Sequence, residues 1–161
     1  MSMKYTKGIV LAEVIVGAAI IATSFVAIIG VYSTLTKYSF QTLPRIQAAM
    51  LAEEGLEALR SMRDESYATR LSPLSTNTTY YLYWSPTLSK FMATTTSSSI
   101  DSTFTRTLTV QNAYRDGSYN LASAGTLDAD TKLLTVSVAW MQGTATSTYV
   151  LKSYISDIFN N

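Results

Sequence analysis

The sequence predicts an α+β protein, in which a long N-terminal helix, its first half transmembrane, packs on a small antiparallel β-sheet. Residues 9–31 are almost continuously apolar, and residues 45–70 place apolar side chains at helical spacing. Several later segments alternate apolar and polar side chains, as half-buried strands do. A chain of 161 residues suits one domain of modest size with an appended helix.

The composition argues against several classes of function. The chain has no Cys and no His, so it lacks thiol nucleophiles, disulfides, and the commonest general base and metal ligand. Twelve Lys and Arg against eleven Asp and Glu leave a net charge of +1, which gives no general phosphate-binding surface. We therefore expect no enzymatic activity, no cofactor and no nucleic-acid partner.

Residues 9–31 (IVLAEVIVGAAIIATSFVAIIGV) contain a single charged side chain, Glu13. As a helix they span about 35 Å, enough to cross a hydrocarbon core of about 30 Å. Lys4 and Lys7 precede the segment and favour a cytoplasmic N-terminus. No small-residue cleavage site follows it, so we expect the segment to remain in a single-pass membrane protein.

Residues 32–70 are expected to continue the helix as an amphipathic segment. One apolar stripe collects Leu51, Ala52, Gly55, Leu56, Leu59 and Met62. The charged side chains that occupy much of the remainder are interpreted as a solvated helix face: Glu53, Glu54, Glu57, Arg60 and Arg63. Pro44 lacks a backbone N–H and is expected to kink or interrupt the helix.

Residues 71–161 form a Ser- and Thr-rich head, for which strands are predicted at residues 79–84, 103–110, 133–141 and 148–155. Leu134, Val136, Val138 and Trp140 share one side of the third strand, and Arg106 falls on the apolar side of the second. Turns are predicted at Asp116-Gly117 and at residues 142–144, and a loop at residues 94–99.

Glu13 is the most informative residue, because a charged side chain at membrane depth costs about 2.5–3.5 kcal/mol on insertion scales. No Lys or Arg lies within residues 9–31 to neutralise it. Cutting the chain between Gly8 and Ile9 would create a cation nearby, the new α-amino group. Glu13 would then be the fifth residue, about one helical turn from that amine.

Residues 7–13 (KGIVLAE), followed by the apolar run, resemble the processing site of type IV prepilins and type II secretion pseudopilins. The resemblance implies that a prepilin peptidase removes a basic leader, residues 1–8, after Gly8 and that the new N-terminus is methylated. Leu11 and Glu13 match the family's leucine and glutamate, while Ile9 stands where the family usually has Phe. Residues 48–64 are similar to the later helix of minor pilins.

This resemblance implies a structural filament subunit, anchored in the membrane and then assembled into a cell-surface filament. Its partners would be the prepilin peptidase, the membrane, and other copies or related pilins. Gly17, Ala18 and Gly30 are small enough to allow close helix packing in such an assembly.

Other interpretations remain open at this stage. The chain fits a single-pass membrane-anchored protein whose head binds a ligand or partner. Asp128 and Asp130 are weak candidates for a calcium site, since a solvated turn is the more common explanation for a lone Asp-Ala-Asp. Tyr80, Tyr81, Tyr83 and Trp84 have rings suited to stacking on bases, but are interpreted as strand and core residues.

Overall fold

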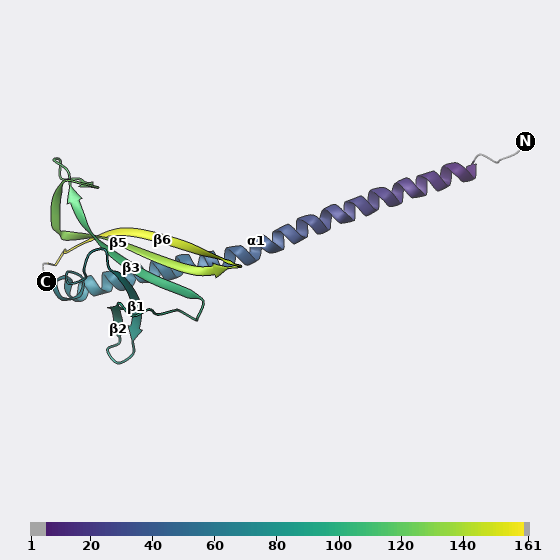
Figure 1. Cartoon of the computed structure of the whole chain (residues 1–161). Helices are drawn as coiled ribbons and strands as arrows, with labels where there is room; N and C mark the ends of the chain where they lie inside the picture. The colour runs from purple at the N-terminus through teal and green to yellow at the C-terminus, as the bar shows by residue number, and fades with distance from the viewer. Residues whose placement is uncertain (1–5, 160–161) are drawn as a thin grey trace, which may run out of the picture. The chain divides into compact units, whose positions relative to one another are not determined.

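The computed structural model describes residues 6–159, with side chains from Ile9 onward. It contains one helix and one sheet (Figure 1), which confirms the α+β prediction. The elements are α1 (Thr6–Arg70), β1 (Thr79–Ser85), β2 (Lys90–Thr94), β3 (Phe104–Arg115), β4 (Leu121–Ala122), β5 (Thr126–Gln142) and β6 (Ala145–Ser156). Every strand pairing is antiparallel, in the order β2-β1-β3-β5-β6, with β4 paired to β3.

The chain divides into two units, Met1–Leu43 and Pro44–Asn161. Of the leader predicted at residues 1–8, residues 1–5 lie outside the described part. For residues 6–8 the backbone is described, and it is helical.

Pro44 lies inside α1, so the interruption that was one of its two expected effects does not occur. Its fixed φ is compatible with a helix, and the backbone is assigned as helical on both sides of it. The non-helical residue within α1 is Ser66, with φ −173° and ψ 114°. The Ser66 hydroxyl accepts a hydrogen bond from the Thr69 N–H at 3.3 Å, so Ser66 acts as the N-cap of the final turn.

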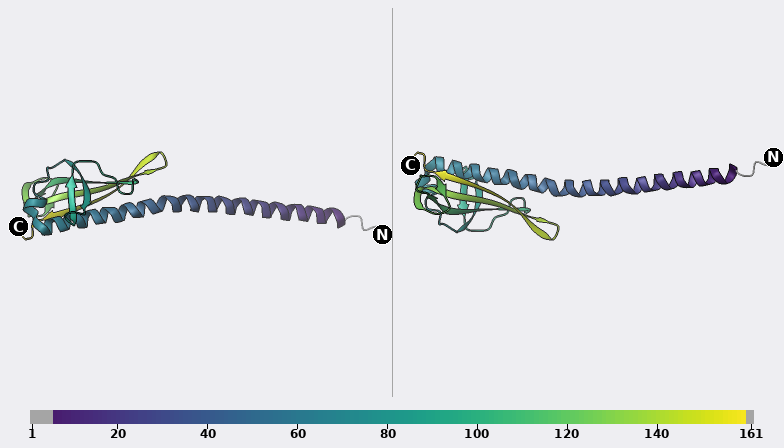
Figure 2. Two further views of the ribbon diagram at one scale, coloured as in Figure 1. Left: turned by 90° about the horizontal axis from the view of Figure 1, so that it is seen from below. Right: turned by 90° about the horizontal axis from the view of Figure 1, so that it is seen from above.

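The core of the second unit lies between residues 44–70 of α1 and one face of the sheet (Figure 2). The helix contributes the predicted stripe, and the sheet contributes alternate side chains of β3 and β5. The buried helical residues are Ala48, Ala52, Gly55, Leu56, Ala58, Leu59, Met62 and Tyr67. The facing strand residues include Phe104, Leu108, Val110, Leu134, Val136, Val138 and Trp140. The inward side predicted for the third strand is confirmed.

Gly55 marks the closest approach of α1 to the sheet. A Cβ atom built at this position would lie 2.9 Å from a methyl carbon of Val136 and 3.1 Å from Cδ of Arg106. Cβ atoms essentially never come within 3.0 Å of another heavy atom, and 3.1 Å is also unusually close even in a close-packed interior. The absence of a side chain at Gly55 therefore sets how near the helix lies to β3 and β5.

Arg106 extends from β3 into this helix–sheet interface and is only 4% exposed. Its Nη1 donates to the carbonyl of Leu51 at 3.1 Å and to Oε2 of Glu54 at 2.8 Å. Its guanidinium also lies 5.8 Å from the ring centroid of Phe91. Glu54 is exposed, as the solvated-face interpretation expected, but it also neutralises a buried cation, which that interpretation missed.

The four predicted strands are present, with longer boundaries. β5 begins at Thr126 rather than near residue 133, because residues 126–128 pair with the end of β3 beyond a bulge at Asn112/Ala113. β2 and β4 were not predicted. Both are short, and their pairing partners β1 and β3 determine their conformation.

The predicted turns are also confirmed. Gly143 connects β5 and β6 with φ +66°, a conformation that favours glycine. At the Asp116-Gly117 turn, the Asp116 carboxylate accepts hydrogen bonds from the backbone N–H groups of Ser118, at 2.8 Å, and Asn120, at 2.9 Å. These hydrogen bonds hold the pKa of Asp116 below its usual range.

A fragment comprising residues 37–161 should be soluble, monomeric and cooperatively folded. All buried apolar side chains of the described chain lie between Ala48 and Ile155, so the truncation removes none of the core. Circular dichroism should show both helix and strand. An unfolded or wholly helical spectrum would contradict this prediction.

Gly55→Val should lower the free energy of unfolding of the same fragment by about 2 kcal/mol, the usual cost of overpacking a filled core. Urea denaturation monitored by tryptophan fluorescence measures the change. Gly117→Ala is the matched control, because nothing lies within 4 Å of a Cβ at Gly117. The control should stay within about 0.5 kcal/mol of the parent. Equal stability of all three proteins would show that the close approach is unimportant.

Candidate functional site

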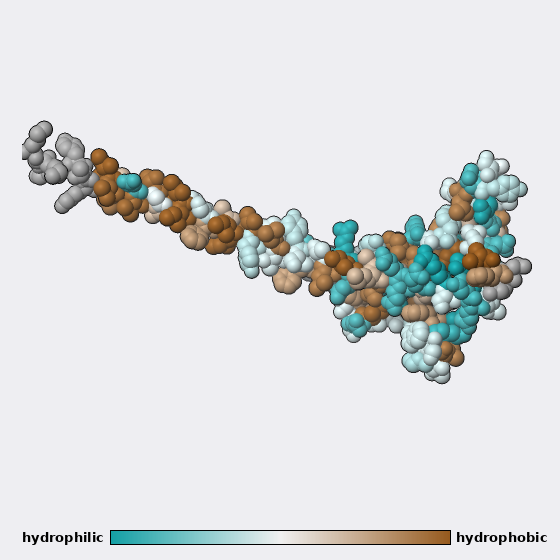
Figure 3. Space-filling view, turned by 180° about the vertical axis from the view of Figure 1, so that it is seen from behind, coloured by the Kyte–Doolittle hydropathy of each residue, from teal (hydrophilic) through white to brown (hydrophobic). Residues whose placement is uncertain are grey.

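The N-terminal part of α1 presents an apolar surface on all sides. Every Val, Ile, Leu and Phe of residues 9–31 is more than half exposed. Brown, apolar residues dominate this part of the helix in Figure 3. By length and composition α1 is the one helix in the described chain able to cross a membrane. Such a helix occurs in single-pass spans and in secretory signal sequences.

The two hydroxyl side chains of this segment are satisfied by its own backbone. The Thr23 hydroxyl donates to the carbonyl of Ala19 or Ile20, at 3.0 and 2.9 Å, and the Ser24 hydroxyl donates to the carbonyl of Ile20 at 2.8 Å. Such back-bonding hides polar groups that hydrocarbon cannot solvate. Neither Thr23 nor Ser24 therefore opposes burial of the segment in an apolar environment.

Glu13 differs from both hydroxyl residues. Its side chain is exposed and has no hydrogen bond or ion pair with any residue among those described. Four positions separate it from Ile9, so the two residues lie one turn apart on the same side of the helix. Within residues 9–31, Glu13 is thus the one polar side chain without a partner in the described chain, and it lies close to the position where the sequence predicts cleavage.

The other predicted residues of this segment have open surroundings. Leu11 is 62% exposed, and Ala18 is also exposed. No heavy atom would lie within 4 Å of a Cβ at Gly17 or Gly30. These glycines are therefore not required by contacts within the described chain. Gly8 lies in helical backbone, and its surroundings are outside the described side chains.

The candidate calcium ligands do not form a cluster. Oδ2 of Asp128 accepts a hydrogen bond from Nε of Arg115 at 2.6 Å, and Oδ1 accepts one from the Asp130 backbone N–H at 3.2 Å. Burial opposes ionisation of Asp128, but hydrogen bonds from Arg115 and Thr131 outweigh it and lower its pKa. The described residues contain no group of three or more acidic side chains placed to bind a metal ion. Asp128 instead links the ends of β3 and β5.

The four aromatic residues between positions 80 and 84 lie on β1 and differ in their contacts and exposure. The Tyr80 hydroxyl accepts a hydrogen bond from the backbone N–H of Ser75 at 2.9 Å. Trp84 packs edge-on against Phe91, with 5.2 Å between the ring centroids. Tyr83 and Trp84 are exposed, which differs from the core placement expected for the group.

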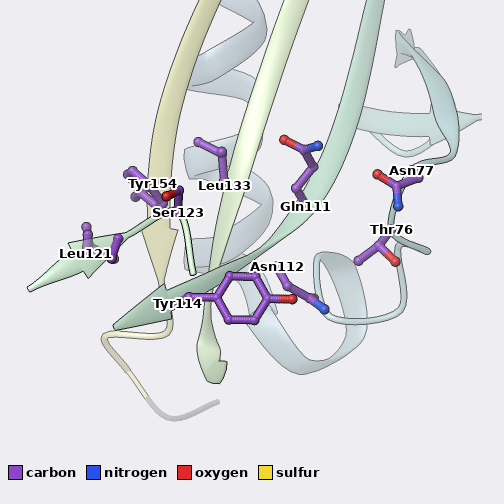
Figure 4. Close-up of a pocket in the computed structure, with 10 residues that line it drawn as sticks. Thr76, Asn77, Gln111, Asn112, Tyr114, Leu121, Ser123, Leu133 and Tyr154 are labelled. Atoms are coloured by element: carbon purple, nitrogen blue, oxygen red, sulfur yellow. The ribbon is translucent and has the colours of Figure 1, made fainter. Parts of the chain in front are cut away.

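A pocket on the other face of the sheet was missed by the sequence analysis. It has a volume of about 470 Å³ and lies over β3, β5 and β6, opposite the face that packs on α1 (Figure 4). Its walls come from these strands, from β4 and from the loop at Thr76 and Asn77. No local motif signals it, because each segment contributes only one to three residues.

Comparisons with protein families, with curated proteins and with solved structures find no match. The architecture itself is pilin-like: a long, apolar N-terminal helix whose later residues pack on an antiparallel sheet.

Proposed function

We propose that this protein is a structural subunit, a pilin or pseudopilin, of a type IV pilus-like or type II secretion filament. Prepilin peptidase cuts the chain after Gly8, residues 9–31 anchor the product in the membrane, and the same helix then forms the filament core. The protein begins as a single-pass membrane protein with a cytoplasmic N-terminus and ends in a cell-surface filament. It is not an enzyme, needs no cofactor and binds no nucleic acid.

The observation that carries the proposal is the unsatisfied carboxylate of Glu13. Thr23 and Ser24 show that the segment hides its other polar side chains within its own helix. Glu13 has no such partner among the described residues, although an ionised carboxylate is much more costly in an apolar medium. A cationic partner outside the chain, or one created by processing, would offset the free-energy penalty of placing this carboxylate in an apolar medium.

Cleavage after Gly8 supplies that partner. The new α-amino group at Ile9 is a cation one helical turn from Glu13, so the carboxylate can pair with its own amine or with that of a neighbouring subunit. Opposite charges attract much more strongly in an apolar environment than in water. Glu13 thus selects subunits that have been processed and brings their helices together in register.

Small residues next to Glu13 support this packing. Gly17 lies one turn after Glu13 on the same side of the helix, and Ala18 follows it. Because nothing within the described chain contacts the position of a Gly17 Cβ, the free surface there suits the backbone of another helix. Gly30 offers a similar place at the far end of the apolar segment.

The first test concerns processing. The protein isolated from its native cell should begin at Ile9, with a methylated α-amino group, and intact mass should show the loss of residues 1–8. Gly8→Phe should block the cut and leave the full-length chain in the membrane. Recovery of an uncut chain in surface filaments would contradict the proposal.

The second test concerns assembly. Glu13→Val should still be inserted and cut, because the variant removes a charge from the span and leaves Gly8 untouched. Its incorporation into filaments should fall at least about tenfold, since the amine of a neighbour remains buried and unpaired, a loss of several kcal/mol. Glu13→Gln should give an intermediate result. The measurement is the ratio of sheared-filament protein to processed membrane protein.

Thr23→Val provides the matched control for this test. It also removes a polar side chain from the apolar segment, but one whose hydrogen bonds are already made within the helix. Its filament ratio should equal that of the parent. Equal ratios for the Glu13 variants as well would remove the assembly role, and would favour a plain membrane-anchored protein whose head binds a ligand.

A further inference from the structure

We propose that the pocket over β3, β5 and β6 binds a neutral carbohydrate unit. This proposal goes beyond filament assembly and does not depend on it, because the pocket belongs entirely to the unit Pro44–Asn161. Its volume of about 470 Å³ falls in the usual range for small-ligand sites. The chemistry of its walls identifies the class of ligand.

A row of three side chains forms the floor. Gln111 of β3 is paired in register with Leu133 of β5, which is paired with Tyr154 of β6. Their sequence neighbours Val110, Leu134 and Ile155 are buried in the core, so alternation places the row on the opposite face. Figure 4 shows Leu133 between Tyr154 and Gln111 on this face. The floor therefore combines an aliphatic side chain, an aromatic ring and an amide.

The walls supply further uncharged polar groups. Asn77 and Thr76 approach from one side, and Tyr114 stands below the row with its hydroxyl directed toward Asn112 (Figure 4). The Asn77 loop is fixed on β3 by its backbone N–H, which donates to the carbonyl of Val110 at 2.9 Å. Within the described chain, the side-chain amides of Asn77 and Gln111 have no hydrogen-bond partner. Each therefore offers both a donor and an acceptor to a ligand.

These groups match the two surfaces of a sugar ring. Adjacent hydroxyls of a pyranose both donate and accept hydrogen bonds, which suits the planar amides of Asn77 and Gln111. The C–H face of the same ring is apolar and suits the rings of Tyr114 and Tyr154. A ligand without hydrogen-bond donors and acceptors would leave the amides unpaired, and a ligand without an apolar face would not use the tyrosines.

The surroundings argue against two other occupants. No charged side chain lines the pocket, so it lacks the Arg or Lys clamp expected for a phosphate or carboxylate. Lys132 lies beside the lining, and its Nζ already donates to Oδ1 of Asn112 at 3.2 Å. An extended peptide binds by adding to an exposed strand edge. β3 and β5 each have a strand on both sides, and the edge strand β6 contributes a single lining residue, Tyr154.

The test uses the full chain in a zwitterionic detergent that contains no sugar. The probes are immobilised neutral oligosaccharides ending in hexose, N-acetylhexosamine or deoxyhexose, together with sialylated and sulfated versions of the same chains. We expect binding to neutral probes, with competition by the free sugar. Gln111→Ala and Tyr114→Ala should each weaken binding about tenfold or more. Asn77→Gly should also weaken it, and it keeps the backbone at φ +60° unstrained.

Gln142→Ala and Tyr83→Ala are the matched controls, because they remove the same side-chain types outside the pocket. Both should bind like the parent, and thermal unfolding should confirm that all variants are folded. Binding to no probe, or binding that the pocket variants leave unchanged, would overturn the proposal. Binding confined to sialylated or sulfated probes would overturn the proposal of a neutral ligand, and would indicate that Lys132 binds the acidic group of the probe.

Discussion

The close packing of α1 on the sheet at Gly55 is the contact on which the folded unit depends. The helix must come near enough for Leu56, Leu59 and Met62 to bury their side chains against β3 and β5. Side-chain atoms of Val136 and Arg106 lie within about 3 Å of where a Cβ of residue 55 would be, so any larger residue at Gly55 would force these neighbours to shift. The position of Arg106 follows from this packing, because its guanidinium reaches the helix at Leu51 and Glu54.

The two halves of α1 handle their polar groups in different ways, and this difference separates their roles. In residues 44–70 polar and charged side chains face solvent or, like Glu54, pair with the sheet. In residues 9–31 the hydroxyls return to the helix backbone, and apolar side chains cover the rest of the surface. An isolated carboxylate on such a surface has a cost that only a partner can remove, which gives Glu13 its importance in the proposed assembly.

The sheet also has two different faces. Its inner face is committed to the core, and its outer face carries Thr, Ser, Gln and Tyr side chains that the fold itself does not need to bury. Beyond the bulge at Asn112/Ala113, Tyr114 of β3 and the paired strand β4 form one wall of the outer pocket. A proposed filament subunit would display this face, so anchoring and recognition would occupy separate parts of one chain.

The sequence by itself determined the elements whose signal is local. Helical spacing of apolar residues defined the stripe from Leu51 to Met62, and alternation defined the inward side of β5. The almost continuously apolar segment 9–31 made Glu13 stand out as its single charged residue. Only the tertiary structure decided the placement of features that need a distant partner. Glu54 pairs with Arg106 across 52 positions, and β2 and β4 gain their conformation from neighbouring strands. The outer pocket is lined by residues from five segments that come together only in the folded chain. The periodicity of any one segment therefore cannot predict it.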